Sequence, residues 1–318
     1  MKWLLRYSFL LVIAACILFF SLWNPVFLSY GNQINILEGS AILLIVALGM
    51  TLVVAMGGID LSVGIALDFG AAFAVVALKE YDAAWYVAIL VGIVGGCLIG
   101  LLNAALTVWL NVSAFMATLG TFFIGSSLQR IFTNGGGPIS HRRMPKEYRD
   151  IAVGDIAGVP TEVVIATVVL ILYFIFLERS ILGKRVQSIG LQPNAALIAG
   201  IEVKRIMFIG FVIAAATCAI GGLIASANIR MFTPLSGFSY LLDAIAAVFI
   251  GASMHPRGRP NVLGTLVGVL FLGILANGLN LMGLNFNTKD ALSGVILLAA
   301  LTFAIGQKRL IGLRKART

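Results

Sequence analysis

Residues 41–64 read AILLIVALGMTLVVAMGGIDLSVG, an apolar run that stops at a pair of glycines and an aspartate. The run extends back to residue 36, and a helix needs about 20 such residues to cross the hydrocarbon core of a membrane. Paired glycines end a helix at little cost, and Asp60 or Ser62 can cap the next helix by accepting its free backbone N–H groups. The stretch therefore predicts a membrane-spanning helix, a break and a second helix.

The composition of the whole chain points to a membrane as well. Of its 318 residues, 60% are hydrophobic and 11% are charged, against about 25% charged in soluble domains. A water-soluble fold is excluded, because so few charges cannot cover its surface. About ten apolar segments are recognised by length, at residues 3–23, 36–56, 63–78, 84–110, 114–132, 161–177, 206–227, 241–252, 262–282 and 291–305. We expect an all-α integral membrane protein, a polytopic helical bundle that forms one transmembrane domain over residues 1–318.

The net charge of +9 concerns membrane orientation rather than nucleic-acid binding. Lys and Arg cluster between the apolar runs instead of forming one basic face, and such clusters mark the cytoplasmic side of a membrane protein. If the N-terminus is cytoplasmic, 14 of the 22 Lys and Arg residues fall on the cytoplasmic side and eight on the other. Four of those eight lie in residues 134–160 beside three acidic residues, which weakens the bias without reversing it. Both termini are therefore expected in the cytoplasm.

A second interruption lies at residues 251–260, which read GASMHPRGRP and follow the short segment 241–252. Interrupted segments at corresponding places in two halves of a chain point to an internal repeat around a central pathway. Because the identity between the halves is slight, the repeat and its absence stay open as alternatives.

Several polar residues lie inside or beside the apolar runs: Asp60, Asp68, Asn103, Thr118, Asp243, Asn277 and Asn280. Buried ionisable groups in membrane proteins tend to face a bundle interior or a watery cavity. Asn and Thr also hydrogen-bond between helices. For the Asn and Thr residues we favour this structural role, whereas for Asp60 and Asp243 both roles stay open.

Residues 178–205 read ERSILGKRVQSIGLQPNAALIAGIEVKR and form the longest basic connector on the expected cytoplasmic side. Pro193 fits the first turn of a short helix that continues through Asn194, Ala195 and Ala196, and Gly200 ends it. We interpret this helix as a docking element for a partner. The alternative is a solvated loop on the lipid headgroups.

Asn194-Ala195-Ala196 with Gly200 resembles the Glu-Ala-Ala…Gly coupling loop of ABC importer permeases, with Asn in place of Glu. The resemblance to the ribose/galactose/xylose-type permeases continues in the break, at Gly57, Gly58, Asp60, Ser62 and Gly64. It extends through Asn103 with residues 114–121, and through residues 242–248 with 264–265. The chain departs from the family at Ser113, where Pro is usual, and at residues 256–260, where the family has a Gly-Gly-x-Gly turn.

The resemblance implies the permease subunit of a bacterial ABC importer for a monosaccharide or sugar-like solute, in the inner membrane. It implies as partners ATPase subunits, a second permease subunit, identical or related, and a periplasmic solute-binding protein. This chain would bind no cofactor or metal and have no catalytic residue, because ATP and Mg would be held by the ATPase subunits. Aromatic and amide side chains suit a sugar, so the candidate pathway residues are Phe69, Asn103, Phe115, Phe122 and Asn277. Packing is the alternative role for each.

Other functions remain to be weighed. Permeases for a nucleoside, a branched-chain amino acid or a signalling molecule share the superfamily, and a secondary transporter would also have broken helices but would need no ATPase. An integral-membrane enzyme would need clustered His, Asp or Glu. The two histidines, His141 and His255, lie in separate loops, which disfavours an enzyme.

Overall fold

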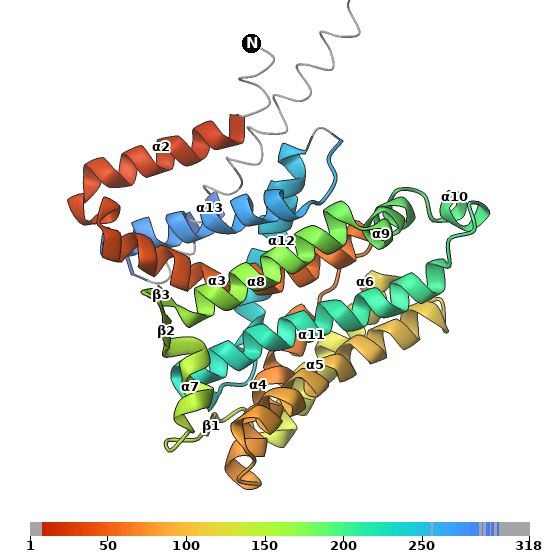
Figure 1. The fold of residues 1–318 in the computed structure, drawn as a ribbon, viewed down its shortest axis with the longest axis horizontal. Coiled ribbons are helices and arrows are strands. Elements are labelled where there is room, and N and C mark those ends of the chain that lie inside the picture. Colours follow the sequence, from red (N-terminus) through yellow and green to blue (C-terminus); the bar gives the residue numbers. More distant parts are fainter. Residues whose placement is uncertain are drawn as a thin grey trace, which may run out of the picture. The chain divides into compact units, whose positions relative to one another are not determined.

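The computed structural model describes residues 8–255 and 257–285, together with residues 288, 291, 292, 294, 295 and 298. This part of the chain is built almost wholly from helices, so the all-α prediction is confirmed (Figure 1). The strands in it are two-residue pieces, β1 (Ile139–Ser140), β2 (Asp155–Ile156), β3 (Val159–Pro160) and β4 (Met231–Phe232). Antiparallel pairs join β1 to β4 and β2 to β3.

The helices in chain order are α2 (Ser8–Trp23), η1 (Pro25–Leu28), α3 (Tyr30–Ala55), α4 (Val63–Glu80), α5 (Trp85–Val108), α6 (Ala114–Phe132), α7 (Lys146–Val153), α8 (Thr161–Phe174), η2 (Ile175–Arg179), α9 (Ile181–Leu191), α10 (Pro193–Ile198), α11 (Val203–Ile229), α12 (Gly237–Met254) and α13 (Val262–Leu281). Contacts divide the chain into two compact units, Ala41–Ile245 on the one hand and Met1–Ser40 with Ala246–Thr318 on the other. The boundaries fall inside α3 and α12.

Six helices in the described part are long and apolar enough to cross a membrane: α3, α5, α8 with η2, α11, α12 and α13. The apolar helix Phe9–Trp23 is shorter. α4 carries Asp68, Lys79 and Glu80, and α6 carries Gln129 and Arg130, so both are more polar. The segment expected at 291–305 lies largely outside the described residues. The count of about ten spans stays a prediction.

Several helices extend beyond their apolar segments. α3 begins at Tyr30 rather than at residue 36, because its polar first turns find partners: Asn32 Nδ2 donates to the Phe27 carbonyl at 2.9 Å. α11 adds residues at both ends, and α12 covers Gly237–Met254 instead of 241–252. The interruption predicted at 251–260 is present, since α12 ends at Met254 and Asn261 caps α13 by accepting from Gly264 N at 2.7 Å.

Small residues bring α4, α5 and α11 together in the unit Ala41–Ile245 (Figure 1). A Cβ added to Gly100 would lie 2.7 Å from the Phe211 carbonyl oxygen, and one added to Gly95 would lie 2.9 Å from the Phe69 carbonyl oxygen. Backbones this close leave no room for a side chain. The three helices therefore form the closely packed centre of this unit.

The segment 134–160, which carries four basic and three acidic residues between two apolar segments, contains the short helix α7. Tyr148 of α7 is fully buried, and its hydroxyl group lies 2.9 Å from Ser226 Oγ of α11. Burial raises the pKa of Tyr148, so its hydroxyl group stays protonated for this hydrogen bond. The contact, with the β1–β4 pair, fastens the segment to the end of α11.

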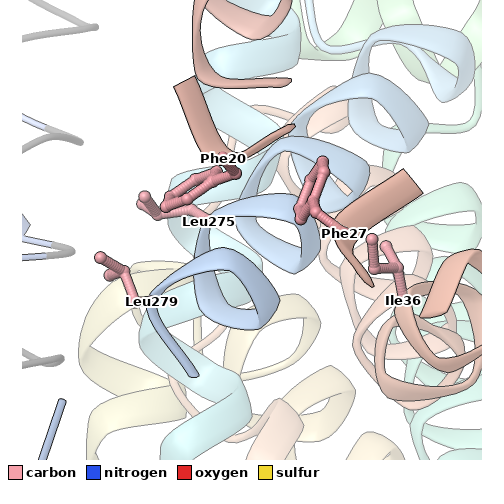
Figure 2. Close-up of a cluster of buried hydrophobic side chains, with 5 residues drawn as sticks. All are labelled: Phe20, Phe27, Ile36, Leu275 and Leu279. Carbon is pink, nitrogen blue, oxygen red and sulfur yellow. The ribbon is translucent and has the colours of Figure 1, made fainter. Parts of the chain in front are cut away.

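The other unit has its own core, which Figure 2 shows as five buried side chains from four helices: Phe20, Phe27, Ile36, Leu275 and Leu279. A reciprocal amide pair joins α3 to α13 beside it. Asn32 Nδ2 donates to Asn277 Oδ1, and Asn277 Nδ2 donates to Asn32 Oδ1, each at 2.9 Å. These contacts hold α13 against α2 and the first turns of α3.

Candidate functional site

The break between α3 and α4 is a hydrogen-bonded loop. Gly57 ends α3 with a φ of 89°, a conformation that glycine adopts without strain. Asp60 is 2% exposed, and its Oδ1 accepts from both the backbone N and the Oγ of Ser62, each at 2.7 Å. Neither side chain therefore caps α4 as predicted, because Asp60 accepts from Ser62, which precedes the first residue of α4, and the side chain of Ser62 makes no cap hydrogen bond to α4. The Ser62 hydroxyl is turned toward Asp60 instead.

Two residues far along the chain brace this loop. Asn103 of α5 donates from Nδ2 to Ser62 Oγ at 2.6 Å. Thr118 Oγ1 of α6 accepts from Leu61 N at 3.1 Å and lies 3.2 Å from the Ile59 carbonyl oxygen, to which it can donate. Asn103 and Thr118 are both fully buried. The structure thus brings together three sequence blocks that were singled out separately: the break, Asn103 and residues 114–121.

Glycine contacts tie each end of the break to another helix. A Cβ added to Gly57 would lie 3.2 Å from Gly190 Cα of α9, and one added to Gly190 would meet the Ala55 carbonyl oxygen. At the other end, Gly64 meets Gly237, the first residue of α12, and a Cβ on either would collide with backbone of the other. The break is therefore in direct backbone contact with α9 and with the start of α12.

A second buried polar cluster lies where α12 begins. Asp68 of α4 is fully buried, and its Oδ1 accepts from Ser236 Oγ at 2.9 Å and from Gly237 N at 2.8 Å. Gln129 Oε1 of α6 accepts from Leu235 N at 2.7 Å. The helix dipole favours a carboxylate at this N-terminus. The sequence marked Asp68 as an embedded polar residue, whereas Gln129 was missed, although it is a polar residue in the apolar segment 114–132.

The connector 178–205 folds into two helices where one was predicted. Ser180 caps α9 by accepting from Gly183 N at 3.0 Å, and Val186 and Ile189 of α9 are buried. Their spacing is that of one helix face, which is the signal that could have predicted α9. The connector is therefore a folded helix pair.

The predicted docking helix is α10, with Pro193 in its first turn. Gly200 follows its end with a φ of 76°. Ala196 is buried against Ile189 and Val203, whereas Asn194 and Ala195 are exposed. Two apolar residues that the sequence reasoning missed are also exposed, Leu197 at 56% and Ile198 at 90%. The helix pair thus presents an apolar tip.

The candidate pathway residues belong to both units and have different neighbours within them. Asn103 belongs to the break, and Asn277 pairs with Asn32 in the other unit. Phe69 stacks on Phe73 with ring centroids 6.0 Å apart, and Phe122 lies 5.9 Å from Phe238. Phe115, in the first turn of α6, is 48% exposed.

The family described as "Branched-chain amino acid transport system / permease component" matches residues 32–301. The ribose import permease protein RbsC of Bacillus subtilis (strain 168) is 34% identical over 293 residues, which cover 92% of this chain and 88% of that protein. RbsC of Escherichia coli (strain K12) is 32% identical over 301 residues, 94% of this chain and 93% of that one. The autoinducer 2 import system permease protein LsrD of Escherichia coli O9:H4 (strain HS) is 28% identical over 245 residues, 76% and 74% of the two chains. No solved structure matches the chain.

Proposed function

The chain belongs to the branched-chain amino acid transport system / permease component family, and from that premise we propose that it is the membrane-spanning subunit of an ATP-driven importer for a monosaccharide or sugar-like solute. Relatives named for ribose import match it over nine-tenths of its length, and a relative named for autoinducer 2 import matches over three-quarters. The substrate class is proposed from these names.

The observation that carries the mechanism is the backbone contact between Gly57 and Gly190. It joins the break after α3 to α9, and α9 continues directly into α10 with its exposed Leu197 and Ile198. ATPase subunits that bind this apolar tip would move the helix pair when ATP closes them, and Gly190 would pass that movement to the break. ATP and Mg belong to the ATPase subunits, and this chain contributes the receiving surface.

The proposed importer contains further subunits, each with its own role. A second permease subunit, identical or related, would complete the pathway, and a periplasmic solute-binding protein would deliver the solute. The distribution of Lys and Arg supports an inner-membrane orientation with both termini and the α9–α10 pair in the cytoplasm. Within 178–205 five basic residues accompany two acidic ones.

Import of a branched-chain amino acid is the second candidate, because the family description names that substrate. The two substrates demand different chemistry: leucine needs an apolar pocket and partners for its charged ends, whereas a sugar needs many hydrogen-bond partners. The names of the relatives favour the sugar.

A competition experiment on the complete complex tests the substrate. Proteoliposomes that hold the permease, its ATPase and its binding protein would be loaded with ATP and given labelled ribose, with unlabelled ribose, another pentose, a hexose or leucine in excess. We expect sugars alone to compete. Competition by leucine, or uptake of labelled leucine in place of the sugar, would contradict sugar import and support import of an amino acid.

A further inference from the structure

α12 exposes a charged side chain, although the helix is long and apolar enough to cross a membrane. The charged residue of α12 is Asp243, seven residues into the helix, and its side chain is exposed. A carboxylate in a membrane-spanning helix is costly against hydrocarbon, so such groups face a bundle interior or a water-filled cavity. The exposure of Asp243 therefore indicates that this side of α12 does not face lipid.

The first two turns of α12 expose two adjacent strips, one polar and one apolar. Ser239 and Asp243 are both exposed, and residues four apart lie on one side of a helix. Phe238 and Leu242, which are 49% and 58% exposed, form the neighbouring strip. The Ser239 hydroxyl group donates to the Ser236 carbonyl oxygen at 2.9 Å, and its own oxygen can still accept. We call Phe238, Ser239, Leu242 and Asp243 the α12 face.

The α12 face combines the groups that a sugar needs. A monosaccharide carries hydroxyl groups around its edge and C–H groups on its two sides. Asp243 and Ser239 can accept from the hydroxyl groups. The ring of Phe238, whose centroid lies 5.9 Å from that of Phe122 of α6, can cover a C–H side. Phe238 and Asp243 are separated along α12 by a rise of about 7.5 Å, which one monosaccharide can bridge.

The surroundings of the α12 face are acidic. Asp68 of α4, Glu162 of α8 and Asp243 all act electrostatically on the Tyr240 hydroxyl group. Asp68 is fully buried and Glu162 is 6% exposed. Like charges repel strongly where water is scarce, whereas a neutral hydroxyl group can donate to a carboxylate. The α12 face therefore suits a neutral, hydroxyl-rich solute better than an anion such as a sugar phosphate.

From the exposed carboxylate, the paired strips and the acidic surroundings, we propose that the α12 face and Phe122 form a contact site for the transported solute, a neutral monosaccharide. Asp243 and Ser239 accept from its hydroxyl groups, and the two rings cover its C–H side. This site presupposes the importer proposed above and assigns to it a solute without net charge. Asp243, whose role the sequence left open, then belongs to the pathway.

Cysteine labelling tests whether the α12 face meets water. Ser239→Cys would be treated with a water-soluble methanethiosulfonate in proteoliposomes of the complete importer. Val94→Cys is the matched control, because Val94 is 55% exposed on the apolar helix α5. We expect S239C to react and V94C to show only the labelling of the protein's own cysteines. Reaction of S239C with a lipid-soluble reagent alone, or with neither reagent, would overturn the site.

Protection by the solute tests what the α12 face contacts. We expect ribose, supplied with ATP and the binding protein, to slow the labelling of S239C, and leucine to have no effect. Labelling that ribose does not slow, in an importer that still takes up ribose, would overturn the contact site and leave the proposed function intact. Protection by leucine, with uptake of leucine and not of ribose, would refute the proposed function.

Asp243→Asn tests the chemistry of the contact, with Asp82→Asn as its control, because Asp82 is exposed between α4 and α5. Uptake of ribose would be compared with uptake of deoxyriboses that each lack one hydroxyl group, at saturating binding protein. In the unaltered importer and in D82N we expect loss of one such group to slow uptake about tenfold, because a hydrogen bond to a charged acceptor is lost. In D243N the same loss should matter about twofold.

The ratio of the two uptake rates is measured on one variant at a time, so it does not depend on how much of that variant folds. An equal ratio in D243N and the unaltered importer would overturn the role of Asp243.

Discussion

A single methyl group added at Gly190 should uncouple α9 from the break after α3. In Gly190→Ala the new Cβ would meet the Ala55 carbonyl oxygen and would lie 3.0 Å from Gly57 N. Atoms in favourable contact stay about 3.5–4.0 Å apart. The contact with Gly57 N alone therefore requires the two backbones to separate by about 0.5–1 Å, and the closer Ala55 carbonyl oxygen requires more. Overpacking of this kind costs about 1–3 kcal/mol, and backbone on both sides leaves no flexible side chain to yield.

The expected consequence is a loss of coupling rather than a loss of the protein. Allosteric coupling of about 1–3 kcal/mol corresponds to a factor of about 5–150, so we expect sugar uptake per ATP hydrolysed to fall at least about fivefold. The assay measures uptake and ATP hydrolysis on the same proteoliposomes, with a thermal melting curve for each variant. Gly120→Ala is the control, because its Cβ would have nothing within 4 Å.

Two results would refute this reasoning. If G190A took up sugar with the same ratio to ATP as the unaltered protein, the Gly57–Gly190 contact would not carry the movement. If G190A and G120A lost uptake equally, the effect would be unrelated to that contact.

Three further predictions concern the tip and the buried amides. Ile198→Asp should weaken binding of the ATPase subunits about tenfold in a pull-down, because an isoleucine contributes roughly 1.5–3 kcal/mol when it is buried. The melting temperature of the variant should equal that of the unaltered protein, because the Ile198 side chain is 90% exposed. Equal binding by the variant and the unaltered protein would show that the ATPase docks elsewhere. Asn103→Ala and Ser62→Ala, alone and combined, should show a coupling of about 0.5–1.5 kcal/mol in a double-mutant cycle of detergent unfolding, and additive effects would mean that the 2.6 Å hydrogen bond contributes nothing. Asn277→Ala should lower the free energy of unfolding by about 0.6–2 kcal/mol through loss of its hydrogen-bonded pair with Asn32, and it should leave the KM of uptake unchanged. A raised KM with unchanged stability would instead show that Asn277 contacts the transported solute.

The elements that the sequence predicts well are those specified locally. The break at residues 57–64 follows from paired glycines and a short-range acceptor, and Asp60 meets Ser62 two residues away. The glycines of α5 act in the same local way, because a missing side chain lets backbones approach whatever the partner is. The end of the docking helix was predicted from Gly200, which is a local signal of the same kind because glycine ends a helix without strain.

The parts that were missed depend on partners distant in the chain. α12 extends back to Gly237 because Asp68 holds that backbone N–H group from another helix, and no local pattern reports this. Composition alone could not separate Asn103, which braces the break, from Asn277, which pairs with Asn32. The sequence shows that Leu197 and Ile198 are apolar, but only the fold shows that both are exposed.

The central claim is that this chain is a passive pathway driven by ATPase subunits that bind α10. The most direct measurement is uptake of labelled sugar into proteoliposomes, with the permease alone and with its ATPase, ATP and binding protein. The account predicts accumulation in the complete system and none with the permease alone. Accumulation by the permease alone, driven by an ion gradient, would contradict it and show a secondary transporter.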